Sequence, residues 1–104
     1  MGLTNKLFEI KAGQVFRDPY NTLSVLPFSY KELQNLGCDP ASLPLLHLEE
    51  DDGHYRIVPN GTSVIVLGNN VEVEVLDKEL DRRYIKQHIP EGYIDTYRRN
   101  FPRT

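Results

Sequence analysis

Hydrophobic and polar residues alternate on both sides of Asp52-Gly53, from about residue 46 to residue 57. Asp-Gly is a strong signal for a two-residue turn, because both central residues of that turn take positive φ values. With Asp52-Gly53 as the turn, Glu49 lies opposite Arg56 and the side chains alternate between two faces. One predicted face carries Leu46, Leu48, Tyr55 and Ile57, and the other carries His47, Glu49, Asp51, His54 and Arg56. The pattern therefore predicts a β-hairpin with a charged tip.

A second hairpin is predicted over residues 63–76. A turn at Asn69-Asn70 separates the side chains cleanly into two faces, which is what sets a strand register. One face carries Val64, Val66, Val71, Val73 and Val75, and the other carries Ile65, Leu67, Glu72 and Glu74. Pro59-Asn60-Gly61 is a turn signal between the two hairpins. We therefore expect an antiparallel meander from about residue 45 to residue 76.

The first 28 residues add further strand signals. Residues 7–16 are typical of a strand pair around Ala12-Gly13, and residues 21–28 of one more strand that ends at Pro27. In total we expect about five to seven strands in an antiparallel sheet, with a partly open barrel as an alternative arrangement.

A short helix near residues 30–36 has signals at both ends. Ser29 and Glu32 have the spacing of a capping box, and Phe28 and Leu33 that of a hydrophobic staple. Gly37 suits the left-handed position that ends a helix, and the residue after it, Cys38, then packs back on the last turn. We interpret Cys38 as a buried apolar residue rather than a nucleophile.

A longer helix is predicted near residues 78–89, capped by Asp77 and ended by Pro90. Residues 90–104 are basic and aromatic, and we expect a further helical turn or an extended tail that is less ordered. The fold class is therefore α+β, with residues 1–89 as a single small domain and residues 90–104 as a C-terminal segment.

Composition narrows the function classes. The chain has 104 residues and a net charge of −3, and no apolar run approaches the roughly 18 residues of a membrane span. The single cysteine excludes an intrachain disulfide, and the first residues lack the pattern of a secretory signal. We therefore expect a cytoplasmic protein that does not bind a membrane.

The stretch from His47 to Arg56 is rich in metal-ligating residue types, but the predicted hairpin argues against a metal site. His47 and His54 would lie about 13 Å apart along the strands, too far to share one ion. The neighbouring pair His54 and Asp51 would sit at an exposed turn, with no partner nucleophile nearby. Nucleotide-binding and hydrolase motifs are absent. We expect no cofactor, no metal and no catalytic residues, and an enzyme is not the favoured class.

The favoured hypothesis is a non-enzymatic protein-binding module, such as an adaptor, an inhibitor or immunity-type protein, or an accessory subunit. Acidic residues suit electrostatic steering, and tyrosine and arginine often anchor interfaces. The predicted partner-binding residues are Glu49, Glu50, Asp51, Asp52, Ile65, Leu67, Tyr93, Tyr97, Arg98 and Arg99. The partner would be another protein, with a homodimer through a sheet edge as a variant of this hypothesis.

Two alternatives remain open. The first 76 residues hold five Lys and Arg against ten Asp and Glu, whereas the last 28 hold seven against five. A nucleic-acid-binding protein would use the basic end of the chain, through Arg82, Arg83, Lys86, Arg98, Arg99 and Arg103. A small enzyme or ligand-binding protein would need a pocket against the sheet, assembled from residues that are distant in the sequence.

Overall fold

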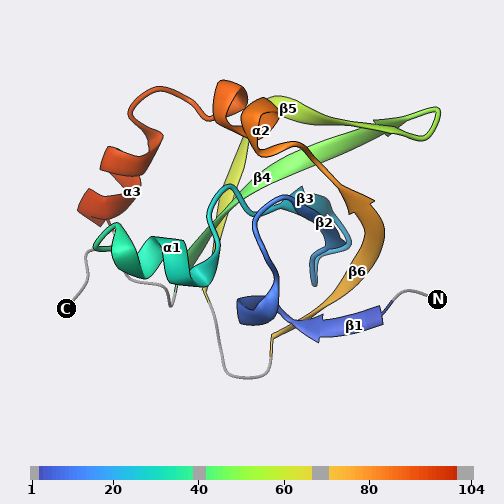
Figure 1. Cartoon of the computed structure of the whole chain (residues 1–104), viewed down its shortest axis with the longest axis horizontal. Helices are drawn as coiled ribbons and strands as arrows, with labels where there is room; N and C mark the ends of the chain where they lie inside the picture. The colour runs from blue at the N-terminus through green and yellow to red at the C-terminus, as the bar shows by residue number, and fades with distance from the viewer. Residues whose placement is uncertain (1–2, 39–41, 67–70, 101–104) are drawn as a thin grey trace.

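The fold is a six-stranded antiparallel sheet with three short α-helices, seen in a computed structural model that describes residues 3–38, 42–66 and 71–100 (Figure 1). The strands are β1 (Leu3–Lys6), β2 (Gln14–Arg17), β3 (Leu23–Val25), β4 (Ser42–Asp51), β5 (His54–Val66) and β6 (Glu72–Glu79). The helices are α1 (Tyr30–Asn35), α2 (Arg82–His88) and α3 (Tyr93–Asn100), and a 3-10 turn spans Leu7–Glu9. The sheet order is β1-β6-β2-β3-β4-β5. The predicted small α+β domain is confirmed, and the sheet is open.

The hairpin of β4 and β5 has the predicted register at its tip. Asp51 pairs with His54, and Glu49 pairs with Arg56. Asp52 and Gly53 have φ values of 52° and 81°, as a two-residue turn of this type requires. The alternation of faces is confirmed too, because Leu46, Leu48 and Ile57 are buried whereas Glu49, Asp51, His54 and Arg56 are exposed.

The second predicted hairpin is wrong. Pro59-Asn60-Gly61 lies within β5 at an irregularity of the ladder, and residues 62–66 continue to pair with residues 42–46 of β4. β6 instead pairs with β1 and β2 on the other side of the sheet. Alternation holds within β6, where Val73 is buried between exposed Glu72 and Glu74. It carried no information about the partner strand, and the predicted common face with Val64 is wrong because Val64 pairs with Pro44. The meander consists of β2 to β5. The predicted turn at Asn69-Asn70 lies outside the described residues.

The predicted strand pair around Ala12-Gly13 is also wrong. β1 and β2 do not pair with each other, because β6 lies between them and bonds to both. Residues 7–9 form a 3-10 turn in which Leu7 is buried. The apolar residues of this segment thus pack in the core, but they come from a turn and from β2, and not from two paired strands. The strand predicted before Pro27 is confirmed as β3.

Helix α1 has the predicted ends. The Ser29 hydroxyl accepts a hydrogen bond from the Glu32 N–H, and the Glu32 carboxylate accepts one from the Ser29 N–H. At the other end the Cys38 N–H donates to the Leu33 carbonyl, and Gly37 has a φ of 80°. Fully buried Cys38 packs with Leu33 in the core, as predicted.

The C-terminal helix predicted near residues 78–89 is confirmed as α2, but Asp77 is not its cap. β6 continues through Asp77 to Glu79, and α2 begins at Arg82 with Asp81 as its N-cap. The Asp81 carboxylate accepts a hydrogen bond from the Arg83 N–H. Both aspartates have the chemistry of a cap, and pairing of β6 with β2 as far as Glu79 decides between them.

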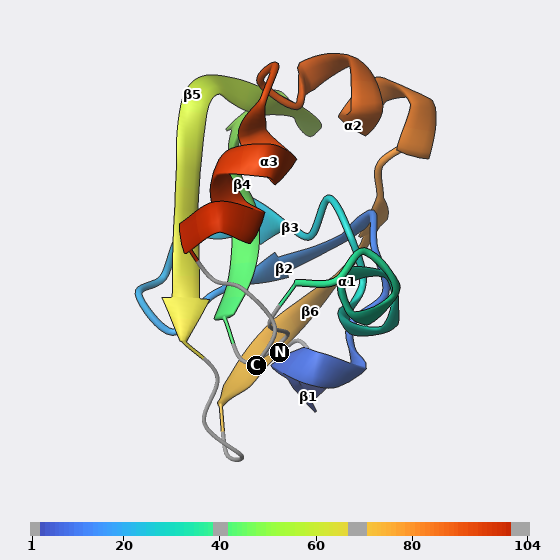
Figure 2. The ribbon, with the colours of Figure 1, turned by 90° about the vertical axis from the view of Figure 1, so that its left-hand side faces the viewer.

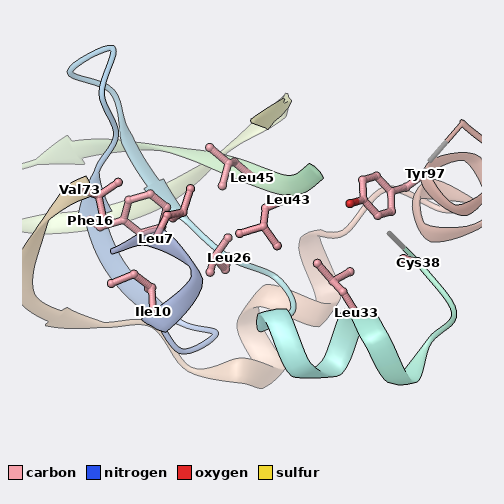
Figure 3. Close-up of a cluster of buried hydrophobic side chains, with 10 residues drawn as sticks. All are labelled: Leu7, Ile10, Phe16, Leu26, Leu33, Cys38, Leu43, Leu45, Val73 and Tyr97. Carbon is pink, nitrogen blue, oxygen red and sulfur yellow. The ribbon is translucent and has the colours of Figure 1, made fainter. Parts of the chain in front are cut away.

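Buried residues form a cluster on each face of the sheet, because neighbouring residues of the central strands point to opposite sides. Phe16, Leu43 and Leu45 lie in a cluster that α1 and α3 cover, and Figure 3 shows it. Val15 and Leu46 lie in a second cluster with Ile85 of α2. Since both faces are covered, the inner part of β4 is buried on both sides, from Ser42 to Leu46 and at Leu48.

Helix α3 belongs to the first of these clusters. Tyr97 is only 3% exposed and lies near Leu33 and Cys38 (Figure 3). Residues 93–100 of the predicted tail are therefore helical, and they contribute a core residue. Residues 101–104 lie outside the described part of the chain.

Candidate functional site

The tip of the β4–β5 hairpin projects away from the helices and the rest of the sheet (Figure 1). Glu49 to His54 are all exposed, including Glu50, which lies on the strand face that carries buried Leu46 and Leu48 further back. Both faces of the hairpin are therefore uncovered at the tip. The two-residue turn holds it as a short, regular ribbon.

The charge of the tip is only partly compensated. An Arg56 guanidinium nitrogen lies 3.2 Å from a Glu49 carboxylate oxygen and 4.0 Å from an Asp51 oxygen. Glu50 and Asp52 complete a set of four carboxylates against one arginine. The tip is thus a compact acidic surface, and these four residues are brought together as predicted.

The other predicted partner-binding residues are not gathered with the tip. Arg98 and Arg99 are exposed in the last turn of α3. Tyr93 is half-buried, and burial raises the pKa of its phenol to about 12. Tyr97 lies in the core. Ile65 lies opposite Leu43 in β5, but its side chain, like all of Leu67, lies outside the described part of the structure.

Two of the arginines that were predicted to bind nucleic acid form ion pairs within the domain. Arg82 places one guanidinium nitrogen 3.1 and 3.3 Å from the two carboxylate oxygens of Glu32, which ties α2 to the cap of α1. Burial raises the pKa of Glu32, but the hydrogen bonds from Ser29 and Arg82 outweigh it, and the pKa lies below its ordinary value. Arg83 pairs with Asp81. Lys86 is exposed, and Arg103 lies outside the described residues.

A hollow of about 270 Å³ lies between the β2–β3 connection and the β4–β5 hairpin. It is lined by Asp18, Tyr20 and Thr22 from the connection, by Leu45 and His47 from β4, and by Ser63 and Val64 from β5. No pattern in the sequence predicts it. The stretch Asp18-Pro19-Tyr20-Asn21-Thr22 carries a turn signal, but nothing local shows that it faces β5.

A polar network supports one wall of this hollow. One oxygen of the buried Asp18 carboxylate accepts the N–H groups of Tyr20 and Thr22, at 3.0 and 2.8 Å. The other oxygen lies 3.4 Å from the hydroxyl of fully buried Ser24. That hydroxyl is also 3.3 Å from Nδ1 of His47, the cross-strand partner of Ser24 in β4. Three segments thus meet in one chain of polar groups.

No group of three or more His, Cys, Asp or Glu residues is arranged to hold a metal ion within residues 3–38, 42–66 and 71–100. No helix in the same ranges is long and apolar enough to cross a membrane. The family models, the curated proteins and the solved structures compared with this chain include no significant match. The hairpin tip and the hollow are therefore the two features of the described residues that bear on function.

Proposed function

We propose that this protein is a binding module that docks on a positively charged surface of another protein through the tip of its β4–β5 hairpin. The observation that carries the proposal is the uncovered, projecting ribbon with four carboxylates at its end. Clustered carboxylates attract a basic surface and raise the association rate. We place the protein in the cytoplasm, since its only cysteine is buried and unpaired.

The shape of the tip supports this proposal more than the C-terminal segment supports binding of nucleic acid. A ribbon that is free on both faces can enter a groove of a partner without rearrangement of the core. Of the basic residues, Arg82 and Arg83 already have carboxylate partners, so fewer are free to neutralise phosphates. An acidic tip would also repel a phosphate backbone.

The test is affinity capture from cells that express the protein, with a charge-altered tip. The triple variant Glu50→Lys, Asp51→Asn and Asp52→Asn leaves the Glu49–Arg56 pair in place. Asparagine at position 52 tolerates the positive φ of that residue. Quantitative mass spectrometry should find a partner that the unaltered protein retains and the tip variant loses, with weaker capture at higher salt.

The matched control carries the same change of net charge elsewhere. Glu9→Lys with Glu91→Lys alters two exposed residues outside the hairpin. It should keep the partner. Equal capture by the unaltered protein and the tip variant would refute the proposal, as would equal loss in tip and control variants. If the captured partner is a second copy of the chain, light scattering will report a homodimer, and edge strand β1 or β5 becomes the next surface to test.

A further inference from the structure

The hollow beside the β2–β3 connection collects exposed hydrophobic side chains. Three large hydrophobic residues of the described chain are exposed, namely Phe8 at 44%, Tyr20 at 82% and Val64 at 37%. Two of the three, Tyr20 and Val64, border this one hollow. They come from different strands or connections, so their proximity is a feature of the fold. The rim of the hollow therefore offers an aromatic ring and an aliphatic group to a small ligand.

The wall formed by the polar network offers a hydrogen-bond acceptor. The protons available to Ser24 and His47 indicate which atom this acceptor is. The Ser24 hydroxyl has one proton and, besides His47, two acceptors at 3.4 Å, a carboxylate oxygen of Asp18 and the Thr22 carbonyl. If Ser24 donates to either of these oxygens, its own oxygen can only accept at His47, so Nδ1 of His47 carries a proton. In the neutral imidazole Nε2 is then the acceptor. Among the described residues Nε2 has no hydrogen-bond partner.

The orientation of His47 makes this acceptor available to the hollow. Its Nδ1 edge is turned to Ser24, which is fully buried, while the side chain of His47 lines the hollow. The opposite edge of the ring, with Nε2, therefore faces away from the protein interior. The loop that supports Asp18 is closed by hydrogen bonds from Asp18 N–H to the Thr22 carbonyl and from Asn21 N–H to the Asp18 carbonyl, both 2.9 Å. The acceptor is thus held in place before any ligand arrives.

We infer that this hollow is a binding site for a small, uncharged ring compound that carries an O–H or N–H donor. The ring packs between Tyr20 and Val64, and the donor bonds to Nε2 of His47. A volume of about 270 Å³ lies just below the roughly 300–1,000 Å³ of sites for drug-sized ligands, so the ligand is of the size of one substituted ring. The buried carboxylate of Asp18 disfavours an anion.

Phenol and anisole test this inference, since they share the ring and differ in the O–H donor. Each is titrated into the ¹⁵N-labelled full chain, and amide shifts are followed by NMR. Phenol should shift the amides of Thr22, His47 and Ser63 saturably, with a Kd in the millimolar range expected for so small a ligand. Anisole should bind about 10-fold more weakly, because it leaves the acceptor unpaired.

Three variants separate this site from general attraction to aromatic surfaces. Tyr20→Ala should weaken phenol binding several-fold without affecting the fold, because the ring is exposed. Phe8→Ala, which removes an exposed aromatic side chain outside the hollow, should leave binding unchanged. His47→Phe keeps a ring but removes Nε2, and it should abolish the difference between phenol and anisole. No saturable shift in the hollow, equal affinity for phenol and anisole in the unaltered protein, or loss in Phe8→Ala but not in Tyr20→Ala would each overturn the inference.

Discussion

The two ends of strand β4 differ in burial, although they belong to one continuous strand. From Ser42 to Leu48 the strand is buried on both faces, with His47 half-buried as the exception. From Glu49 onward it is exposed on both faces, and the hairpin leaves the body of the domain (Figure 1). Figure 2 shows the inner end, where α3 lies in front of β4. β4 pairs with β5 at both ends, with one irregularity of the ladder between Leu46 and Leu48. The difference therefore lies in what covers the strand, not in its local conformation.

This contrast assigns stability to one end, and the proposed function places recognition at the other. At the inner end, the apolar side chains alternate between two buried clusters, one on each face of the sheet. At the tip, the side chains contact mainly solvent and each other, so their substitution costs the fold little. Charged residues at the tip can therefore be substituted with little loss of fold stability.

Truncation of a core side chain should have the largest effect. Leu46→Ala removes a buried group from the cluster under α2, and we expect a loss of about 2–5 kcal/mol in the free energy of unfolding, measured by urea titration. The control Glu50→Ala alters the same strand face four residues on, at the tip, and should stay within about 0.5 kcal/mol of the unaltered protein. Similar losses in the two variants would break the contrast between the two ends.

Substitution of two glycines that have similar φ angles should have a smaller effect on the free energy of unfolding. Gly37 and Gly53 have φ values of 80° and 81°, and a Cβ at either would meet no atom within 4 Å. Only backbone strain remains, roughly 1–2 kcal/mol. Gly37→Ala should cost this amount, because the end of α1 packs on the core through Cys38. Gly53→Ala should cost less, because the free tip relaxes locally. A greater loss for Gly53→Ala in thermal unfolding would show that the tip is part of the cooperative core.

Neutralisation of two ion pairs should have the smallest effect and a defined pH dependence. The pKa of Glu32 is lowered in the folded state, so its charge stabilises the fold above the ordinary value of 4.5, and this contribution is lost as the pH falls through the folded value. Glu32→Gln should therefore reduce stability at pH 7, by at most about 1 kcal/mol because the pair is 40% and 41% exposed. The difference from the unaltered protein should shrink in acid.

The matched variant at the tip is Glu49→Gln, whose pair with Arg56 is more exposed. It should change the free energy of unfolding at pH 7 by less than Glu32→Gln does. Urea titrations of both variants at pH 7 give this comparison, and repeating those of Glu32→Gln below pH 4.5 tests its pH dependence. A greater effect at Glu49, or an undiminished effect of Glu32→Gln in acid, would contradict the assignment of stability to the body of the domain.

Features that depend on a few adjacent residues could be predicted. The capping box of Ser29 and Glu32, the turn at Asp52-Gly53 and the register around it were all correct, because each is set by bonds within a short stretch of chain. The start of α2 was predicted four residues too early, since Asp77 and Asp81 are both suitable caps and a distant strand pairing selects one. Of the candidate sites, the acidic tip could be predicted for the same local reason, whereas the hollow could not.

The amino-acid sequence alone determined the local elements of this protein: which residues share a strand face, where the first helix begins and ends, and which hairpin carries the acidic residues. The tertiary structure decided which strands are neighbours. It placed β6 between β1 and β2, continued β5 along β4 past Pro59, and brought Asp18 and Ser24 to His47. Strand pairing is decided by the burial of both sheet faces under the three helices. The free energy gained by this burial depends on the whole domain and not on any single segment.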